Sequence, residues 1–158
     1  MDSPYRSFNT KKTNILRCGT VIFNKTMDKI VIILNRYSYQ MGVNKWGLPK
    51  GHLNKNEDFS VCAQRETKEE TGLNISIERD SILIKVSKTA YYPIILDESE
   101  CVFNISDTYE IYKVEWMDIE KLKQMPKNNK NYELKKILND STLSRAKRIA
   151  RSNKVRLL

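Results

Sequence analysis

Residues 51–73 of this 158-residue chain read GHLNKNEDFSVCAQRETKEETGL, a segment that predicts one helix with an acidic face. The helix is expected over residues 58–71, with Asp58 near its start and Gly72 just past its end, where glycine accepts the left-handed conformation that terminates many helices. Apolar or small groups recur along it at helical spacing and form one stripe: Phe59, Cys62, Ala63 and the methyl group of Thr67. We expect this stripe to pack against the rest of the domain.

Three carboxylates of this segment, Glu66, Glu69 and Glu70, lie at positions i, i+3 and i+4 and share one face of the helix. Adjacent negative charges repel one another unless a cation neutralises them, and Mg²⁺ and Mn²⁺ prefer oxygen ligands. Arg65 stands beside Glu66 and four residues before Glu69, so its guanidinium group can fix a carboxylate rotamer. These residues alone leave two interpretations open, a divalent-metal site and a solvated acidic face interleaved with Arg65 and Lys68.

The complete spacing resembles the Nudix box, Gly-x5-Glu-x7-Arg-Glu-U-x-Glu-Glu-x-Gly-U, in which U is an apolar residue. The fixed positions are all matched, beginning with Gly51 and Glu57, and Leu73 fits the last apolar position. Thr67 is the single departure, and we expect it to cost a little stability because its methyl group still packs there. The resemblance covers about residues 14–138 and implies an α/β (α+β) fold, the Nudix α/β/α sandwich with a mixed β-sheet. It also implies a hydrolase of phosphoric anhydride bonds that uses Mg²⁺ or Mn²⁺.

The same resemblance implies roles for single residues. The implied metal ligands are Glu66, Glu69, Glu70 and the carbonyl oxygen of Gly51. Arg65 would orient Glu66 through a salt bridge. A further catalytic and metal-binding carboxylate is expected five residues before a Glu-Trp pair, which here means Glu110, and the general base stays open among Glu66, Glu70 and Glu110. A solvent-facing strand glutamate is the alternative interpretation of Glu110. The substitutes are then Glu98, Glu100 and Glu115.

The residues around the box resemble two Nudix subfamilies. Residues 46–51, WGLPKG, and residues 109–122 resemble mRNA-decapping enzymes, which makes decapping the first assignment, with Trp46, Lys50 and His52 as substrate-binding residues. Residues 49–52, PKGH, and 17–19, RCG, resemble dinucleoside polyphosphate (Ap4A-type) hydrolases, the second assignment. A diphosphoinositol polyphosphate phosphohydrolase and an inactive nucleotide- or RNA-binding module remain as alternatives. The aromatic candidates for stacking a base are Tyr37, Tyr39, Tyr91, Tyr92 and Phe103.

Charge divides the chain into two parts. The chain holds 28 Lys and Arg against 19 Asp and Glu, a net charge of +9, and residues 121–158 alone carry 12 of the basic residues and only two acidic ones. Such asymmetry suggests a polyanionic partner, either nucleic acid or a membrane surface. The resemblance to decapping enzymes favours nucleic acid, because it implies a basic terminal helix that holds the RNA body. The RNA-binding residues expected on it are Arg145, Lys147, Arg148, Arg151, Lys154 and Arg156. A solvated basic face without a partner is the alternative.

Several classes of protein are excluded by composition. No apolar run approaches the roughly 20 residues that span a bilayer, the first residues lack the apolar core of a signal peptide, and His52 is the only histidine. Three widely spaced cysteines argue against a disulfide framework and for a reducing compartment, so we expect a cytoplasmic protein without membrane association. The expected partner is a nucleotide or capped RNA, and whether a protein activator is needed stays open.

The remaining elements follow from periodicity and turn residues. Residues 1–138 are expected to form the Nudix domain with a short polar N-terminal arm, and residues 139–158 a basic C-terminal helix packed on the same domain. Strands are expected over residues 15–24, 29–37, 75–77, 82–86 and 109–116. Further helical segments are expected over residues 118–124, 129–138 and 142–158.

Overall fold

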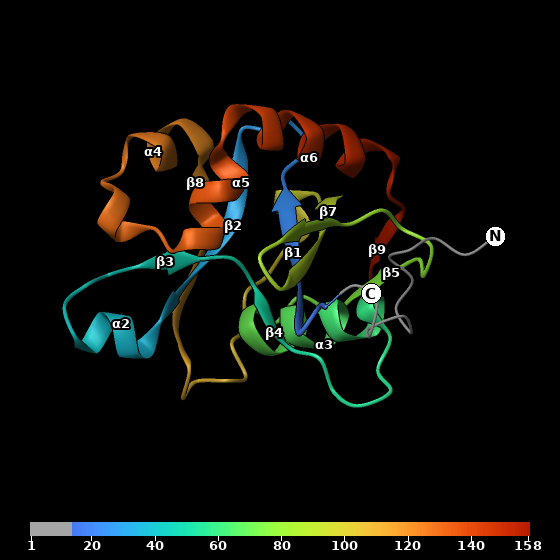
Figure 1. The fold of residues 1–158 in the computed structure, drawn as a ribbon, viewed down its shortest axis with the longest axis horizontal. Coiled ribbons are helices and arrows are strands. Elements are labelled where there is room, and N and C mark those ends of the chain that lie inside the picture. Colours follow the sequence, from blue (N-terminus) through green and yellow to red (C-terminus); the bar gives the residue numbers. More distant parts are fainter. Residues whose placement is uncertain (1–13) are drawn as a thin grey trace.

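A computed structural model describes residues 14–158, which place helices on both faces of a β-sheet (Figure 1). The polar N-terminal arm lies outside the described residues. The strands are β1 (Arg17–Phe23), β2 (Lys29–Asn35), β3 (Trp46–Gly47), β4 (Lys50–His52), β5 (Ile75–Ile77), β6 (Ile84–Val86), β7 (Thr89–Ile95), β8 (Ile111–Asp118) and β9 (Val155–Leu157). The helices are α2 (Arg36–Gln40), α3 (Phe59–Thr71), α4 (Ile119–Gln124), α5 (Tyr132–Leu138) and α6 (Asp140–Ser152), with 3-10 turns η1 (Glu98–Glu100) and η2 (Lys127–Asn129).

β1 lies at the centre of the main sheet, whose strand order is β3-β2-β1-β7-β6, with β8 on the far side of β2. β1 is parallel to β7 and antiparallel to β2 and β4, which confirms the expected mixed sheet. The pairing of β1 with β2 is confined to Phe23↔Ile30, while β4 pairs with the opposite end of β1 at Arg17↔His52. The two central strands therefore separate toward Arg17, and β4 lies beside the opening.

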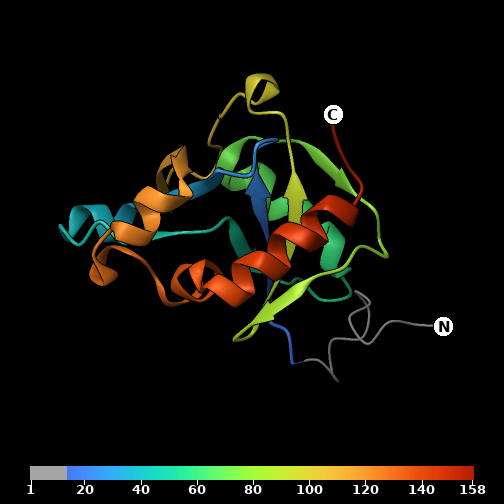
Figure 2. The same ribbon diagram turned by 90° about the horizontal axis from the view of Figure 1, so that it is seen from above.

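Two layers of helix enclose the sheet: Figures 1 and 2 show α3 on one face and α5 with α6 on the other. Successive side chains of a strand point to opposite faces, and β1 follows this rule. Cys18 and Ile22 pack in the cluster under α3, whereas Val21 and Phe23 pack in the cluster that includes α5 and α6. Arg17 lies at the same parity as Val21 and therefore points toward the α5 layer. The arrangement confirms the α/β (α+β) class with helices on both faces.

α3 begins one residue after the predicted start and ends at the predicted residue, because its signals are local. Asp58 is the N-cap, and Gly72 ends the helix in the left-handed conformation with φ 84°. The predicted stripe is buried, and the methyl group of Thr67 is fully enclosed. The Thr67 hydroxyl lies 2.9 Å from the hydroxyl of Thr20 on β1, so the polar atom that departs from the Nudix box has a buried hydrogen-bond partner.

Two of the expected elements end earlier than predicted, and side-chain hydrogen bonds explain both ends. The strand expected over residues 29–37 ends at Asn35, because its side chain accepts hydrogen bonds from the N–H groups of Tyr37 and Ser38 and caps α2. The helix expected over residues 142–158 ends at Ser152, since the Asn153 side chain bonds to Ile82 and Pro93, and the chain then pairs with β5 as β9.

β7 is a central strand that was not predicted from the sequence, and it contains Pro93. A proline lacks the N–H group that a strand flanked on both sides would need. β6 pairs with β7 only from Thr89 to Tyr91, so Pro93 needs a strand partner on the β1 side alone, where it lies opposite Val21.

α6 carries its apolar residues on one buried face: Leu143, Ala146, Ile149 and Ala150. They belong to the same buried cluster as β1, β7 and α5, so this helix forms part of the domain core. Within residues 14–158, no helix is long and apolar enough to cross a membrane.

Candidate active site

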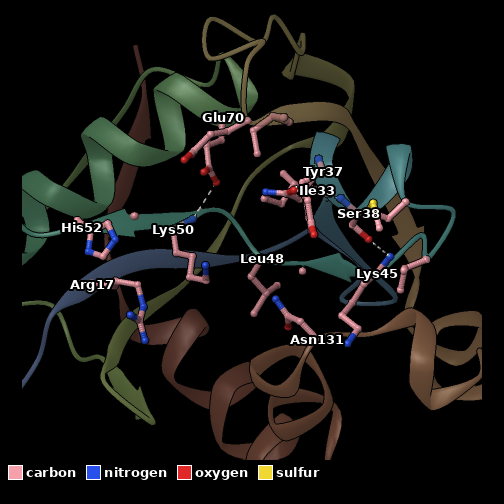
Figure 3. Close-up of a pocket in the computed structure, with 17 residues that line it drawn as sticks. Arg17, Ile33, Tyr37, Ser38, Lys45, Leu48, Lys50, His52, Glu70 and Asn131 are labelled. Atoms are coloured by element: carbon pink, nitrogen blue, oxygen red, sulfur yellow. Dashed lines mark hydrogen bonds between the residues drawn. The ribbon is translucent and has the colours of Figure 1, made fainter.

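The opening between β1 and β2 leads into a cleft of about 450 Å³. Its walls come from both faces of the sheet, from α2 with the segment after it, and from β4 (Figure 3). The lining residues are Arg17, Ile33, Asn35, Tyr37, Ser38, Met41, Val43, Lys45, Gly47, Leu48, Lys50, Gly51, His52, Glu70, Glu110, Ile111 and Asn131. The cleft thus joins carboxylates of the α3 side to cationic side chains of the α5 side.

Glu70 supplies the carboxylate that is most deeply placed in the cleft. It is 4% exposed, and its Oε1 atom accepts a hydrogen bond of 3.0 Å from the backbone N–H of Lys50 (Figure 3). Burial raises the pKa of Glu70 to about 8, and the charges of Glu66 and Glu110 add to the rise. An anion held in this position would be stabilised by a cation.

Glu66 lies against the backbone of Gly51. A Cβ atom built on Gly51 would stand 2.0 Å from the Glu66 carboxyl carbon, so no larger residue fits while Glu66 keeps this position. Arg65 donates a hydrogen bond of 2.6 Å from Nη1 to Glu66 Oε2. Burial nevertheless raises the pKa of Glu66, with the neighbouring charges of Glu69 and Glu110 contributing. The glycine of the box is therefore required by the close approach of a carboxylate.

Arg65 is held by a second carboxylate. Its Nε and Nη2 atoms donate hydrogen bonds of 2.8 and 2.9 Å to the two carboxylate oxygens of Glu57, and Nη2 also donates to the His52 carbonyl oxygen. The hydrogen bond from Arg65 lowers the pKa of Glu57, and Glu57 in turn raises the pKa of Arg65. Glu69 lies 3.6 Å from Arg65 Nη1, at the exposed edge of this network.

Glu110 occupies a turn immediately before β8, where it lines the cleft and is exposed. Its carbonyl oxygen accepts a hydrogen bond of 2.6 Å from the backbone N–H of Arg36, which fixes the turn against α2. The three substitutes do not line the cleft. Glu98 pairs with Lys29, Glu100 belongs to η1, and Glu115 pairs with Lys113.

The donor set of this site is composed of oxygen atoms, as a hard divalent cation requires. The negative charge of Glu110 raises the pKa of both Glu66 and Glu70, and the charge of Glu66 raises the pKa of Glu70 further, so the residues fit a bound Mg²⁺ or Mn²⁺ ion. In the conformation described for residues 14–158, no three carboxylate, thiol or imidazole groups converge into a ready-made metal cage. Glu66 is engaged by Arg65, and Glu70 by the Lys50 backbone.

Lys50 and His52 line the cleft as expected for substrate-binding residues, whereas Trp46 does not. Trp46 lines a separate hollow and packs against the core. Arg17 and Asn131 also line the cleft but were not among the site residues expected from the sequence. Arg17 lies opposite His52 because β1 pairs with β4. No local sequence motif predicts this pairing, so the place of Arg17 in the cleft could not be read from the sequence.

The aromatic candidates separate clearly. Tyr37 lines the cleft and is 70% exposed, which leaves its ring free to meet a base. Tyr91 and Tyr92 are fully buried, and Phe103 packs near Trp116, so these three are unsuited to stacking a base. Tyr39 stacks on Tyr112 with ring centroids 3.7 Å apart, outside the cleft.

The six basic residues expected to bind RNA lie on α6 and in the C-terminal segment that contains β9. Five of them are exposed and Lys147 is half-buried. α6 packs on the sheet face opposite α3 (Figure 2), and none of these six residues lines the cleft. α5 directly precedes α6 in the chain, and the N-cap residue of α5, Asn131, lines the cleft.

A family model described as the NUDIX domain matches residues 14–138. The chain belongs to the Nudix family. Nudix proteins generally use divalent metal ions, in agreement with the oxygen donors of this Nudix domain.

Relatives of the Nudix domain include members of both subfamilies that the sequence resembles. The Saccharomyces cerevisiae m7GpppN-mRNA hydrolase is 31% identical over 140 residues, which cover 85% of this chain but only 14% of that protein. The asymmetrical bis(5'-nucleosyl)-tetraphosphatase of Caenorhabditis elegans is 39% identical over 74 residues, which cover 47% of this chain and 51% of that protein. An Ap4A hydrolase of C. elegans in a binary complex shares the fold, with a TM-score of 0.59 at 21% identity over 84% of this chain and 98% of that chain.

Proposed function

We propose that this Nudix protein is a metal-dependent pyrophosphohydrolase whose substrate is the 5′ cap of RNA. The observation that carries the proposal is the cleft itself, which is lined both by the buried carboxylate of Glu70 and by the cationic side chains of Lys50 and Arg17. A cation that shields an anionic phosphate chain from the carboxylates would strengthen the binding of that chain there. Carboxylates and cations in one cleft are therefore the arrangement that hydrolysis of a phosphoric anhydride requires.

The residues take distinct roles in this proposal. Glu66, Glu69 and Glu70 would hold Mg²⁺ or Mn²⁺, with the Gly51 carbonyl and Glu110 as further oxygen ligands. The ion supplies charge neutralisation and lowers the pKa of a bound water. Arg65 keeps Glu66 against Gly51, and its bond to Glu57 limits the movement of that pair.

The remaining side chains bind the substrate. Lys50 presents an ammonium group to a bridging phosphate, and His52 lies beside it in the cleft. The general base comes from Glu66, Glu70 or Glu110. Of these, Glu110 is exposed at the cleft and lies on a turn, free of the ion pair that engages Glu66.

Capped RNA is preferred as substrate for two reasons. The yeast relative named as an mRNA cap hydrolase aligns with 85% of the chain. The exposed basic residues of α6 also form a surface that suits a long polyanion and serves no purpose for a small nucleotide. A dinucleoside polyphosphate is the second candidate, favoured by the 39% identity to the C. elegans tetraphosphatase over 74 residues.

Hydrolysis of three substrates compared side by side, at low and high salt, tests this proposal. The substrates are capped RNA, the free cap dinucleotide and diadenosine tetraphosphate, each with Mg²⁺ and with Mn²⁺. We expect the highest kcat/KM for capped RNA and a preference that shrinks as salt rises. Faster hydrolysis of diadenosine tetraphosphate at both salts would favour the second candidate, and no turnover of any substrate would favour a binding module. A diphosphoinositol polyphosphate is added as a fourth substrate, and faster hydrolysis of it than of the other three would favour the phosphohydrolase alternative.

A further inference from the structure

Arg17 is a cationic residue of the cleft to which the proposed mechanism gives no task. It lies opposite His52 across the β1–β4 pairing and points to the α5 side of the sheet. Figure 3 shows its side chain extending in the same direction as that of Lys50, away from Glu70. Arg17 and Lys50 also line a shallow groove that continues from the cleft toward Tyr132 at the start of α5. Arg17 therefore stands where the cleft and this groove meet.

A buried network fixes the guanidinium group of Arg17. Its Nε atom donates a hydrogen bond of 3.0 Å to the Thr89 hydroxyl, and that hydroxyl donates a bond of 2.7 Å to Glu133 Oε2. The Tyr91 hydroxyl donates to the other oxygen of Glu133. Glu133 is 7% exposed, which is rare for a carboxylate and costly unless its charge is compensated. Its compensation comes from two hydroxyl donors and from Arg17, whose Nη2 atom lies 3.8 Å away.

This network leaves the outer part of the guanidinium group open. Within residues 14–158, neither Nη atom of Arg17 donates a hydrogen bond, and the side chain is 26% exposed. An arginine presents a planar set of donors that matches the oxygens of a phosphate group. A structural ion pair alone would need no opening to the cleft. Arg17 is oriented by a buried carboxylate, and its outer N–H donors face the cleft. These are the properties of a residue that recognises an anionic ligand.

We infer that Arg17 binds a phosphate group of the substrate, and that Thr89, Glu133 and Tyr91 are the residues that position it. The inference rests on the proposed function in taking the substrate to be a polyphosphate, but not in taking it to be capped RNA. The phosphate has two sources, the bridge between two nucleosides and the first phosphodiester of an RNA body. Both are reached from the junction of cleft and groove.

Binding measured without metal tests the role of Arg17 independently of turnover. The full chain and its Arg17→Gln and Arg17→Lys variants are titrated in EDTA with inorganic tripolyphosphate, the cap dinucleotide and capped RNA. We expect Arg17→Gln to raise Kd about tenfold to a hundredfold. The Kd of Arg17→Lys should lie between those of the wild type and Arg17→Gln, because lysine keeps the positive charge but lacks the planar set of guanidinium donors. Losses for all three ligands identify a bridging phosphate, and a loss confined to capped RNA identifies the phosphodiester. Unchanged Kd values for all three ligands overturn the inference.

The failure of the proposed function would look different. A protein that binds tripolyphosphate through Arg17 but does not hydrolyse capped RNA would contradict the substrate and leave the inference standing. A protein that hydrolyses capped RNA with the same KM in the wild type and in Arg17→Gln would contradict the inference and leave the substrate standing.

A double-variant comparison tests the positioning residues. Thr89→Val removes the hydroxyl that joins Arg17 to Glu133 while keeping the side-chain volume, and Thr89→Ser keeps the hydroxyl as the matched control. We expect Thr89→Val to raise Kd for the same ligand several-fold and Thr89→Ser to have little effect. In the Arg17→Gln background Thr89→Val should cause no further loss. An equal loss in both backgrounds means that Thr89 supports only the fold, and Tyr91→Phe repeats the comparison if Thr89→Val does not fold.

Discussion

Thr67 is the residue at which the chain departs from the Nudix box, and its surroundings account for the departure. Its hydroxyl and that of Thr20 form a buried hydrogen bond of 2.9 Å between α3 and β1. Thr67→Val would restore the usual apolar residue, yet we expect it to lower the free energy of unfolding by about 1 kcal/mol because it leaves Thr20 without this partner. Urea unfolding of Thr67→Val, Thr20→Val and the double variant measures this. The double variant should lose less than the sum of the single losses, and strict additivity would mean that the hydroxyls do not interact.

Glu70 makes stability depend on pH in the metal-free protein. Burial raises its pKa to about 8, so between its ordinary range and pH 8 the folded protein holds a proton that the unfolded chain has released. The contribution of Glu70 to stability is therefore present at low pH and is lost as pH rises toward 8. Thermal unfolding in EDTA from pH 5 to pH 8 should show a larger decline for the wild type than for Glu70→Gln. Parallel curves would show that Glu70 ionises at its ordinary pH.

Single residues of the box were predictable because their signals are local, and others were not. The carboxylate spacing, the Gly72 cap and the place of Arg65 beside Glu66 follow from helical geometry alone. The pairing of Arg17 with Glu133 connects residues of β1 and α5 that are far apart in the chain, so no spacing in the sequence reveals it. Trp46 was expected in the cleft from its place beside the box, but β3 directs it to another hollow.

At the level of elements, the end of α3 is held by its contact with the loop at residues 104–107. Gly72 has φ 84°, and a Cβ atom there would stand 2.4 Å from the Asn104 nitrogen. Gly42 has a similar φ of 74° with open space around its Cβ position, which makes it a matched control. We expect Gly42→Ala to cost about 1 kcal/mol from backbone strain and Gly72→Ala clearly more. Equal losses in chemical denaturation would show that the loop yields without cost.

The elements that the sequence did not predict depend on their neighbours. β7 lies between β1 and β6 although it contains a proline. Pro93 is tolerated because β6 pairs with β7 only as far as Tyr91. The C-terminal helix ends at Ser152 because Asn153 bonds to strand β7 and to Ile82, and β9 then pairs with β5. Helical periodicity and strand propensity are properties of a single segment. They do not show which other element that segment pairs with or packs against in the fold.

On the scale of the whole molecule, the excess positive charge of the last 38 residues lies outside the cleft. Because α6 also supplies buried core residues, its charge is best removed by substitution: Arg145→Gln, Arg148→Gln and Arg151→Gln together. We expect this variant to bind capped RNA more weakly and to lower the slope of log K against log salt by about 2. Turnover of the cap dinucleotide should stay unchanged.

The control for this variant removes the same charge from exposed positions outside the last 38 residues, as Lys25→Gln, Lys55→Gln and Lys85→Gln. Filter-binding titrations at several salt concentrations compare the two. An equal loss of affinity in both variants would mean that net charge, and not the α6 surface, attracts RNA.

The most direct test of the account is the rate of Mg²⁺-dependent hydrolysis of capped RNA by Glu70→Gln. The substituted amide oxygen can still accept the Lys50 N–H bond, so the fold and its unfolding temperature should be preserved. With the carboxylate lost, we expect kcat to fall about a hundredfold or more. A Glu70→Gln protein that is folded and keeps most of its Mg²⁺-dependent activity would contradict the assignment of the α3 carboxylates as the metal site.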